Sequence, residues 1–232
     1  SAPIREWGRA GLRRMRPALK KLTGVTVEGK AVRFATIVDW RGVRKEEILR
    51  VGLCDPEIVD AGETDPDAPG YHVATEWRFY GDGTITVGAS FRQFGVPTEV
   101  ARIGYRFVFK GGRTRATYKA RGPWDSYADR KLSAFVGEYA ADSDTFVENY
   151  GRTCDSGKRM DAYAVRLEST GLTFAALYHP LAAMQVCPYS PTELILNTHP
   201  ALLPEPTKTE LGLYAAQAGI GSGNCGPMPE TQ

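Results

Sequence analysis

Arg121-Gly122-Pro123-Trp124-Asp125-Ser126-Tyr127-Ala128-Asp129-Arg130-Lys131 is the segment that decides the fold. It is too polar for a core strand and too irregular for an amphipathic helix. Its Gly-Pro pair predicts a turn, and the aromatic rings of Trp124 and Tyr127 need partly buried positions. We expect Asp129 and Arg130 to form a buried or half-buried ion pair that fixes this turn. On chemistry alone, the segment is an ion-paired loop that locks two strands together.

The same segment resembles the Gly-Arg-Gly-Pro-His-Glu-Asn-Tyr-Pro-Asp-Arg-Lys signature of the C-terminal small-chain domain of β-galactosidases of glycoside hydrolase family 2. Trp124 replaces the His of that signature, Asp125 the Glu and Ala128 the Pro. Three further blocks follow in the order of the family, so that the similarity covers roughly residues 103–227. They read Cys154-Asp155-Ser156-Gly157-Lys158-Arg159-Met160-Asp161, then Tyr189-Ser190-Pro191-Thr192-Glu193-Leu194 with Thr198-His199, and last Ala218-Gly219-Ile220-Gly221-Ser222-Gly223-Asn224-Cys225-Gly226-Pro227.

The resemblance implies an all-β fold, mainly antiparallel, of the supersandwich type found in galactose mutarotase. It also implies a function: the C-terminal domain of a β-galactosidase-like enzyme, which lines the active-site cleft and binds carbohydrate in the full enzyme. Both catalytic glutamates of that family belong to a separate (β/α)8 barrel, so the chain alone is expected to be inactive and no catalytic residue is assigned. The expected partners are that barrel, the other domains of the parent enzyme and a β-galactoside. Relative to the family, the chain is expected to be truncated at both ends.

Two sets of residues follow from the resemblance. The loops from Cys154 to Arg159 and from Gly219 to Pro227 are expected to reach the galactoside, and Cys225 stands where the family has a Trp that stacks on sugar. The expected carbohydrate contacts are Asp155, Arg159, Asn224 and Cys225 from these loops. Trp124 is added on chemical grounds, because an aromatic ring in a polar loop either stacks on the apolar face of a pyranose or fills a structural position. The expected structural residues of the first block are Gly122, Pro123, Tyr127, Asp129 and Arg130.

Composition bounds the remaining possibilities. Of 232 residues, 42% are hydrophobic and 24% are charged, and the formal net charge is +2. These values predict a substantial core without a large charged field, and no apolar run reaches the length of a membrane span. We therefore expect neither a nucleic-acid nor a membrane partner. The four cysteines contain no Cys-x-x-Cys pair and the three histidines have no ligand spacing, so we expect no metal and no cofactor. The compartment, cytoplasmic or periplasmic, stays open.

The chain is expected to hold a helical segment over residues 1–21 and one β-domain over residues 22–232. Ile4, Trp7, Leu12, Met15 and Leu19 recur at nearly helical spacings, which predicts a helix from Pro3 to about Lys21. Beyond it, residues 71–80 alternate between apolar and polar side chains, as half-buried strands do. The other expected strands are residues 25–27, 31–38, 84–92, 103–109, 114–119, 161–168, 172–178 and 211–214.

Two other functions remain open from the sequence. A free-standing aldose mutarotase or epimerase would need a general acid and base on either side of the sugar, usually His and Glu. A non-catalytic carbohydrate-binding module would present an exposed aromatic platform and would bind sugar by itself. Mutarotation of α-galactose and calorimetric binding of galactose or lactose distinguish these functions from the first.

Overall fold

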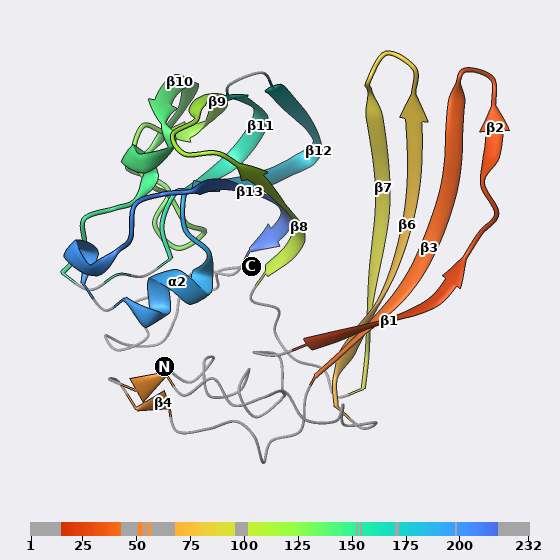
Figure 1. Ribbon diagram of the computed structural model, residues 1–232, viewed down its shortest axis with the longest axis horizontal. Coiled ribbons are helices and arrows are strands. Elements are labelled where there is room, and N and C mark those ends of the chain that lie inside the picture. Colours follow the sequence, from red (N-terminus) through yellow and green to blue (C-terminus); the bar gives the residue numbers. More distant parts are fainter. Residues whose placement is uncertain are drawn as a thin grey trace. The chain divides into compact units, whose positions relative to one another are not determined.

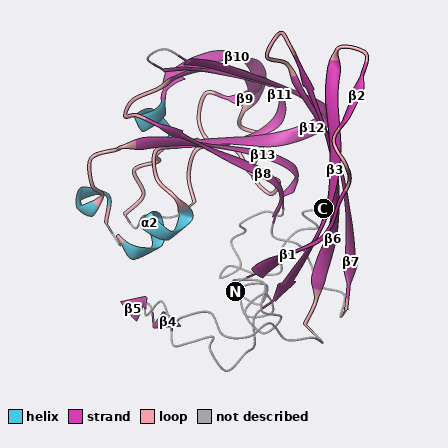
Figure 2. Cartoon of the chain, turned by 45° about the vertical axis from the view of Figure 1, so that its right-hand side comes forward, coloured by secondary structure: helices cyan, strands magenta, loops and turns pink. Residues whose placement is uncertain are grey.

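The computed structural model describes residues 15–42, 51–52, 55–56, 68–95, 102–151, 153, 155–169, 172–197 and 199–217. These residues form antiparallel strands with a few short helical turns, which confirms the predicted all-β class (Figures 1 and 2). The chain divides into two compact units, residues 1–99 and 100–232. The single domain expected over residues 22–232 stays a prediction.

The first unit contains a five-stranded sheet in the order β1-β3-β6-β7, with β2 paired to β3. Its hairpin turns use glycines in the left-handed region, Gly29 (φ 62°) after β2 and Gly83 (φ 87°) after β6, as the Gly-rich turn sequences predict. A separate two-stranded ladder joins β4 and β5. The strands are β1 (Met15–Leu22), β2 (Thr26–Glu28), β3 (Ala31–Gly42), β4 (Val51–Gly52), β5 (Asp55–Pro56), β6 (Gly70–Tyr80) and β7 (Ile85–Phe94).

The predicted N-terminal helix is wrong where the structure describes it. Residues Met15 to Leu22 are strand β1, which pairs antiparallel with β3 from Met15↔Gly42 to Leu22↔Thr36. Pro17 has no N–H to donate, and an edge strand tolerates this whereas the interior of a helix does not. Tertiary pairing with β3 therefore overrides the helical spacing of the apolar residues. Residues 3–14 of the predicted helix lie outside the described residues.

The second unit contains a six-stranded sheet in the order β10-β9-β11-β12-β13-β8. Strands β8 and β9 are consecutive in sequence but are not neighbours in this order, although only a short turn with Gly111 (φ 109°) joins them. The elements are β8 (Arg102–Lys110), β9 (Arg115–Gly122), β10 (Phe135–Asp142), the 3-10 turn η2 (Ser143–Phe146), β11 (Lys158–Ser169), β12 (Leu172–Cys187), α2 (Pro191–Leu196), the 3-10 turn η3 (Pro200–Leu202) and β13 (Lys208–Gln217).

The core of the second unit lies on one face of this sheet. Along β9, Ala116, Tyr118 and Ala120 are buried while the residues between them are exposed or half-buried, which is the period of two expected for a strand with one covered face. Phe146 of η2 and Leu211 of β13 belong to the same cluster and are fully buried. The loops that form the candidate site follow the end of β9 and precede the start of β11.

Candidate functional site

The loop from Gly122 to Lys131 leaves the end of β9 through a cis Gly122–Pro123 peptide bond. It then runs beside the start of β11. The N–H of Ser126 donates to the carbonyl oxygen of Lys158 at 3.0 Å, and the N–H of Met160 donates to Ser126 Oγ at 2.9 Å. Both bonds tie the middle of the loop to a strand, so that the Gly-Pro turn predicted from the sequence ends in a docked segment.

Asp125 is the centre of a small polar cluster in this loop. Its Oδ2 accepts hydrogen bonds from Arg130 Nη2 and from the Tyr150 hydroxyl, each at 2.9 Å, while its own N–H donates to Glu148 Oε1. The guanidinium of Arg130 also stands over the Tyr127 ring, 4.8 Å from its centroid. The sequence predicted an ion pair between Arg130 and Asp129; the ion pair found in the structure joins Arg130 to Asp125.

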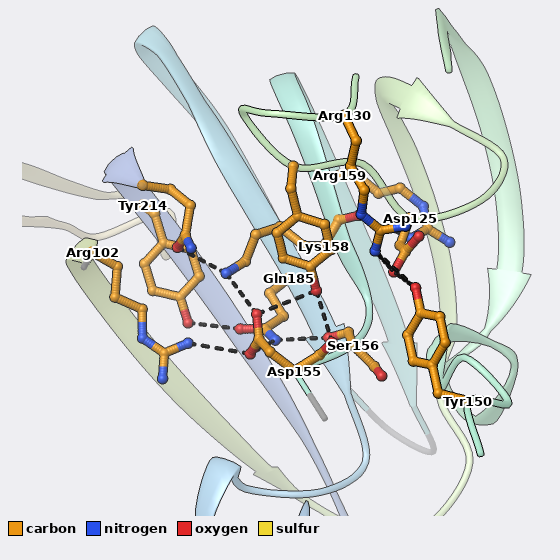
Figure 3. Close-up of polar contacts among 12 residues, drawn as sticks. Arg102, Asp125, Arg130, Tyr150, Asp155, Ser156, Lys158, Arg159, Gln185 and Tyr214 are labelled. Atoms are coloured by element: carbon orange, nitrogen blue, oxygen red, sulfur yellow. Dashed lines mark hydrogen bonds and ion pairs between the residues drawn. The ribbon is translucent and has the colours of Figure 1, made fainter. Parts of the chain in front are cut away.

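A second cluster surrounds Asp155, and we call it the Asp155 network (Figure 3). One oxygen of its carboxylate, Oδ1, accepts from Gln185 Nε2 at 2.9 Å and from Arg102 Nη1 at 3.4 Å. The other oxygen, Oδ2, accepts from Lys158 Nζ at 3.0 Å and lies 3.3 Å from the Tyr127 hydroxyl. That hydroxyl donates to the main-chain oxygen of Asp155 at 2.9 Å. Burial by itself would raise the pKa of Asp155, but Lys158, Arg102 and these hydrogen bonds outweigh it and lower the pKa.

Lys158 is the buried cation of the Asp155 network. Its side chain has no solvent exposure, and its ammonium donates to Asp155 Oδ2 and, at 2.8 Å, to Gln217 Oε1 at the end of β13. The rings of Tyr127 and Tyr214 lie 5.3 Å and 5.0 Å from Nζ. Burial lowers the pKa of Lys158 to about 8, with a smaller contribution from Arg102 and an opposing one from Asp155.

Arg159 points into the core of the unit instead. It is 3% exposed, its Nε donates to the Tyr118 hydroxyl at 3.3 Å, and its Nη1 donates to the carbonyl oxygen of Lys158 at 3.0 Å. Its guanidinium stands 4.8 Å from the centroid of the Phe146 ring. Arg159 therefore supports the same turn of chain that carries the Asp155 network.

Of the expected carbohydrate contacts, Asp155 and Arg159 come from the same short segment, but Asp155 lies in the network around Lys158 whereas Arg159 points into the core. Trp124 lies in the neighbouring loop, and 53% of its surface is exposed. Asn224 and Cys225 lie outside the described residues, as does the whole stretch from Gly219 to Pro227. Among the expected structural residues, Tyr127 is fully buried, which suits an anchor of the loop.

Sequence reasoning missed six members of these clusters: Arg102, Tyr150, Lys158, Gln185, Tyr214 and Gln217. The hydroxyl of Tyr214 donates to Gln185 Oε1 at 2.9 Å, and Gln185 Nε2 donates to the carbonyl oxygen of Ser156 at 2.7 Å as well as to Asp155. Gln185 and Tyr214 belong to strands β12 and β13. Their proximity to Asp155 depends on the pairing of these strands, which no local sequence motif predicts. Lys158 did lie inside one of the family blocks, at a position that the block leaves variable.

Other functional features are limited in the part of the chain that the structure covers. Within it, no group of three or more His, Cys, Asp or Glu side chains is arranged to hold a metal ion. No helix among the described residues is long and apolar enough to cross a membrane. The two carboxylates of the site, Asp125, which is buried, and Asp155, which is partly exposed, each face a cation and a tyrosine hydroxyl.

Fold and site together define an all-β chain in which partly buried ion pairs and tyrosines hold one docked loop against a strand. The chain belongs to the β-galactosidase small-chain family, because the family model "Beta galactosidase small chain" matches residues 2–232.

Curated relatives agree with this assignment. The β-galactosidase of Arthrobacter sp. (strain B7) is 31% identical over 132 residues, which are 54% of this chain and 13% of that relative. The β-galactosidase of Priestia megaterium (strain DSM 319 / IMG 1521) is 26% identical over 146 residues, 62% of this chain and 14% of the relative. The β-galactosidase small subunit of Latilactobacillus sakei is 29% identical over 163 residues, 64% of this chain and 50% of the relative. The chain thus spans a small part of the first two relatives and half of the third.

Proposed function

We propose that this chain is the C-terminal domain of a β-galactosidase of the family 2 type, that it lines the active-site cleft, and that it does not cleave glycosides by itself. The observation that carries the proposal is the match of residues 2–232 to the small-chain model, supported by a relative named as a small subunit. A subunit bearing that name implies a larger companion. The bond-breaking acids are assigned to that companion, which is either a separate subunit or the remaining domains of one long chain.

Each expected site residue receives a role within this proposal. Trp124 is half-exposed on a loop that is held at both ends, so its ring is suited to stack on the apolar face of a pyranose. Asp155 and Arg159 serve the site by holding the chain around it, because their polar atoms already meet protein partners. Asn224 and Cys225 are proposed to contact the galactoside from the Gly-rich stretch, as the resemblance implies.

Complementation tests the proposal. The chain is purified and assayed with o-nitrophenyl-β-D-galactoside, first alone and then mixed with the large subunit, or the remaining domains, of the parent β-galactosidase. We expect no turnover from the chain alone, none or little from the companion alone, and saturable activity from the mixture. Turnover by the chain alone, or a companion whose activity does not respond to the chain, would refute the proposal.

The same preparation separates the two other functions. Accelerated mutarotation of α-galactose by the isolated chain would make it a mutarotase. Calorimetric binding of galactose or lactose by the isolated chain, without complementation, would make it a free-standing carbohydrate-binding module. We expect neither signal above background, because the proposed cleft is complete only in the assembled enzyme.

A further inference from the structure

Lys158 of the Asp155 network (Figure 3) contacts both the docked loop, through the Tyr127 ring, and the end of strand β13, through Gln217. Its backbone carbonyl accepts from the Ser126 N–H, and its ammonium stands against the face of the Tyr127 ring. On the other side, its ammonium binds Gln217, which pairs with Arg102 at the edge of β13 and β8. One residue thus connects two segments that lie far apart in sequence.

Stability alone is a weak reason for a charge in this place. Withdrawing an ammonium from water is costly, and replacing a buried ion pair by apolar side chains is often neutral or stabilising. What such a pair does provide is geometry, because a wrong placement leaves a charge without its partner. The ammonium has one carboxylate and one amide oxygen to meet, and the two tyrosine rings close the remaining directions.

A short series of contacts connects Lys158 to the loop position of Trp124. Tyr127, three residues further along the loop, is held by its hydroxyl to the main chain of Asp155 and by its ring to Lys158. Between them, Ser126 is fixed by two hydrogen bonds to the backbone at positions 158 and 160. The exposed ring of Trp124 therefore projects from a loop whose position is set at Lys158.

We propose that Lys158 is a positioning residue of the assembled β-galactosidase, whose buried ammonium locks the Tyr127 anchor and so orients the loop that presents Trp124 to the galactoside. This inference rests on the proposed function for its link to the substrate. Its structural part, the order of the loop, is a property of the chain alone. The two parts are measured separately.

Lys158→Met tests the inference, since it keeps an unbranched side chain that is one atom shorter and removes the charge and the three donors of the ammonium. Lys119→Met is the matched control: Lys119 also faces a carboxylate (Glu138, 3.8 Å) and a tyrosine ring (Tyr163, 6.0 Å), but half of its side chain is exposed. In the isolated chain, we expect amide hydrogen exchange in the peptide 124–131 to accelerate about tenfold for Lys158→Met and to stay unchanged for the control. In the complemented enzyme, we expect kcat/KM to fall at least about tenfold for Lys158→Met, mostly through KM.

Proton loss supplies a readout that a merely structural role would not move. The charged and titratable groups facing Lys158 are Asp155, Arg102, Tyr127 and Tyr214, and burial leaves its pKa at about 8. Below that pH the wild-type residue carries a charge that methionine lacks, and above it both side chains are neutral. The ratio of kcat/KM between wild type and Lys158→Met is therefore expected to be largest near pH 7 and to shrink as pH rises through about 8.

The outcomes are distinct. If Lys158→Met does not fold, the double variant Asp155→Asn/Lys158→Met, which removes both charges together, is measured instead. If both variants are unfolded, Lys158 has a structural role only and the inference is overturned. Folded variants whose exchange and kcat/KM stay within about twofold of wild type overturn it too. If the wild-type chain fails to complement, the proposed function fails, while the exchange experiment still decides whether Lys158 holds the loop.

Discussion

Removing Arg130 exposes how the docked loop is stabilised. The carboxylate of Asp125 is nearly buried, with 6% of its side chain exposed, and accepts hydrogen bonds from Arg130 and Tyr150 at 2.9 Å each. In Arg130→Ala the negative charge stays in place, and the Tyr150 hydroxyl and the solvent at the rim must compensate for the lost guanidinium. The variant should therefore destabilise the fold of the second unit.

The magnitude follows from burial. Breaking a fully buried pair by removing one partner costs about 3–5 kcal/mol. The side chain of Arg130 is 44% exposed, so water screens the pair and lowers that figure, whereas exposed pairs contribute only about 0–1 kcal/mol. The stacking of the guanidinium over the Tyr127 ring, 4.8 Å away, adds about 0.5–1 kcal/mol. We expect a total loss of about 2 kcal/mol in the free energy of unfolding.

Urea denaturation at pH 7, followed by circular dichroism, measures this loss. Arg166→Ala is the control, because Arg166 pairs with Glu168 at 2.6 Å while both side chains are well exposed, and its removal should cost less than about 1 kcal/mol. An Arg130→Ala midpoint no lower than that of the control would refute the reasoning. It would mean that Asp125 finds enough compensation without the cation.

Three further predictions concern other parts of the second unit. Gly157→Ala should cost about 3 kcal/mol or more in urea melts, because Gly157 has φ 81° and an added Cβ would meet a β12 carbonyl at 2.0 Å, whereas Gly151→Ala meets nothing and should stay within about 0.5 kcal/mol. Burial would raise the pKa of Glu193, but Lys208 and the capping hydrogen bonds lower it to about 2. The stability that this carboxylate contributes is therefore present above about pH 4.5 and is lost as the pH falls toward 2. In Glu193→Gln, the urea midpoint should fall less steeply with decreasing pH over this range. Burial raises the pKa of Cys187 to about 12, so Cys187→Ser should leave the native thiol titre at pH 8 unchanged and lower the titre in urea by one.

Much of the fold was predictable because strands with one covered face carry their period in the sequence. The alternation of residues 71–80 predicted β6, and the turn Gly81-Asp82-Gly83 after it predicted its hairpin with β7. Strand β10 was missed: Phe135–Asp142 carries alanines and a glycine in place of alternating large residues, and as the end strand of its sheet it pairs with β9 alone. Helix α2 was missed although Ser190-Pro191-Thr192-Glu193 is a capping box with proline at the first turn, and the structure shows both reciprocal hydrogen bonds.

The site was less predictable, and Lys158 shows why. A lysine in a polar turn is almost always solvated, so the sequence favoured Asp155 and Arg159 on either side of it and gave Lys158 no role. Burial of its ammonium depends on Tyr127, Tyr214 and Gln217, which reach it only after β11, β12 and β13 have paired.

The same reasoning explains the partner of Arg130. Adjacent residues such as Asp129 and Arg130 are close in sequence, but successive side chains in an extended segment point in different directions, and the turn decides which carboxylate an arginine meets. In this loop the turn after Tyr127 brings Arg130 back over the Tyr127 ring and onto Asp125, five positions earlier. Residue types therefore identified the loop as ion-paired, whereas the pairing itself depended on the backbone path.

Tyr127 contacts both Arg130 and Lys158, so Tyr127→Phe tests whether the Asp125 cluster and the Asp155 network are independent. The substitution keeps the ring that both cations face and removes only the hydroxyl bound to Asp155. Loss of that buried hydrogen bond should cost about 1–2 kcal/mol in urea melts, while the cost of Arg130→Ala should be the same in the Tyr127→Phe background as in wild type. A non-additive double variant would show instead that the two clusters act as one unit.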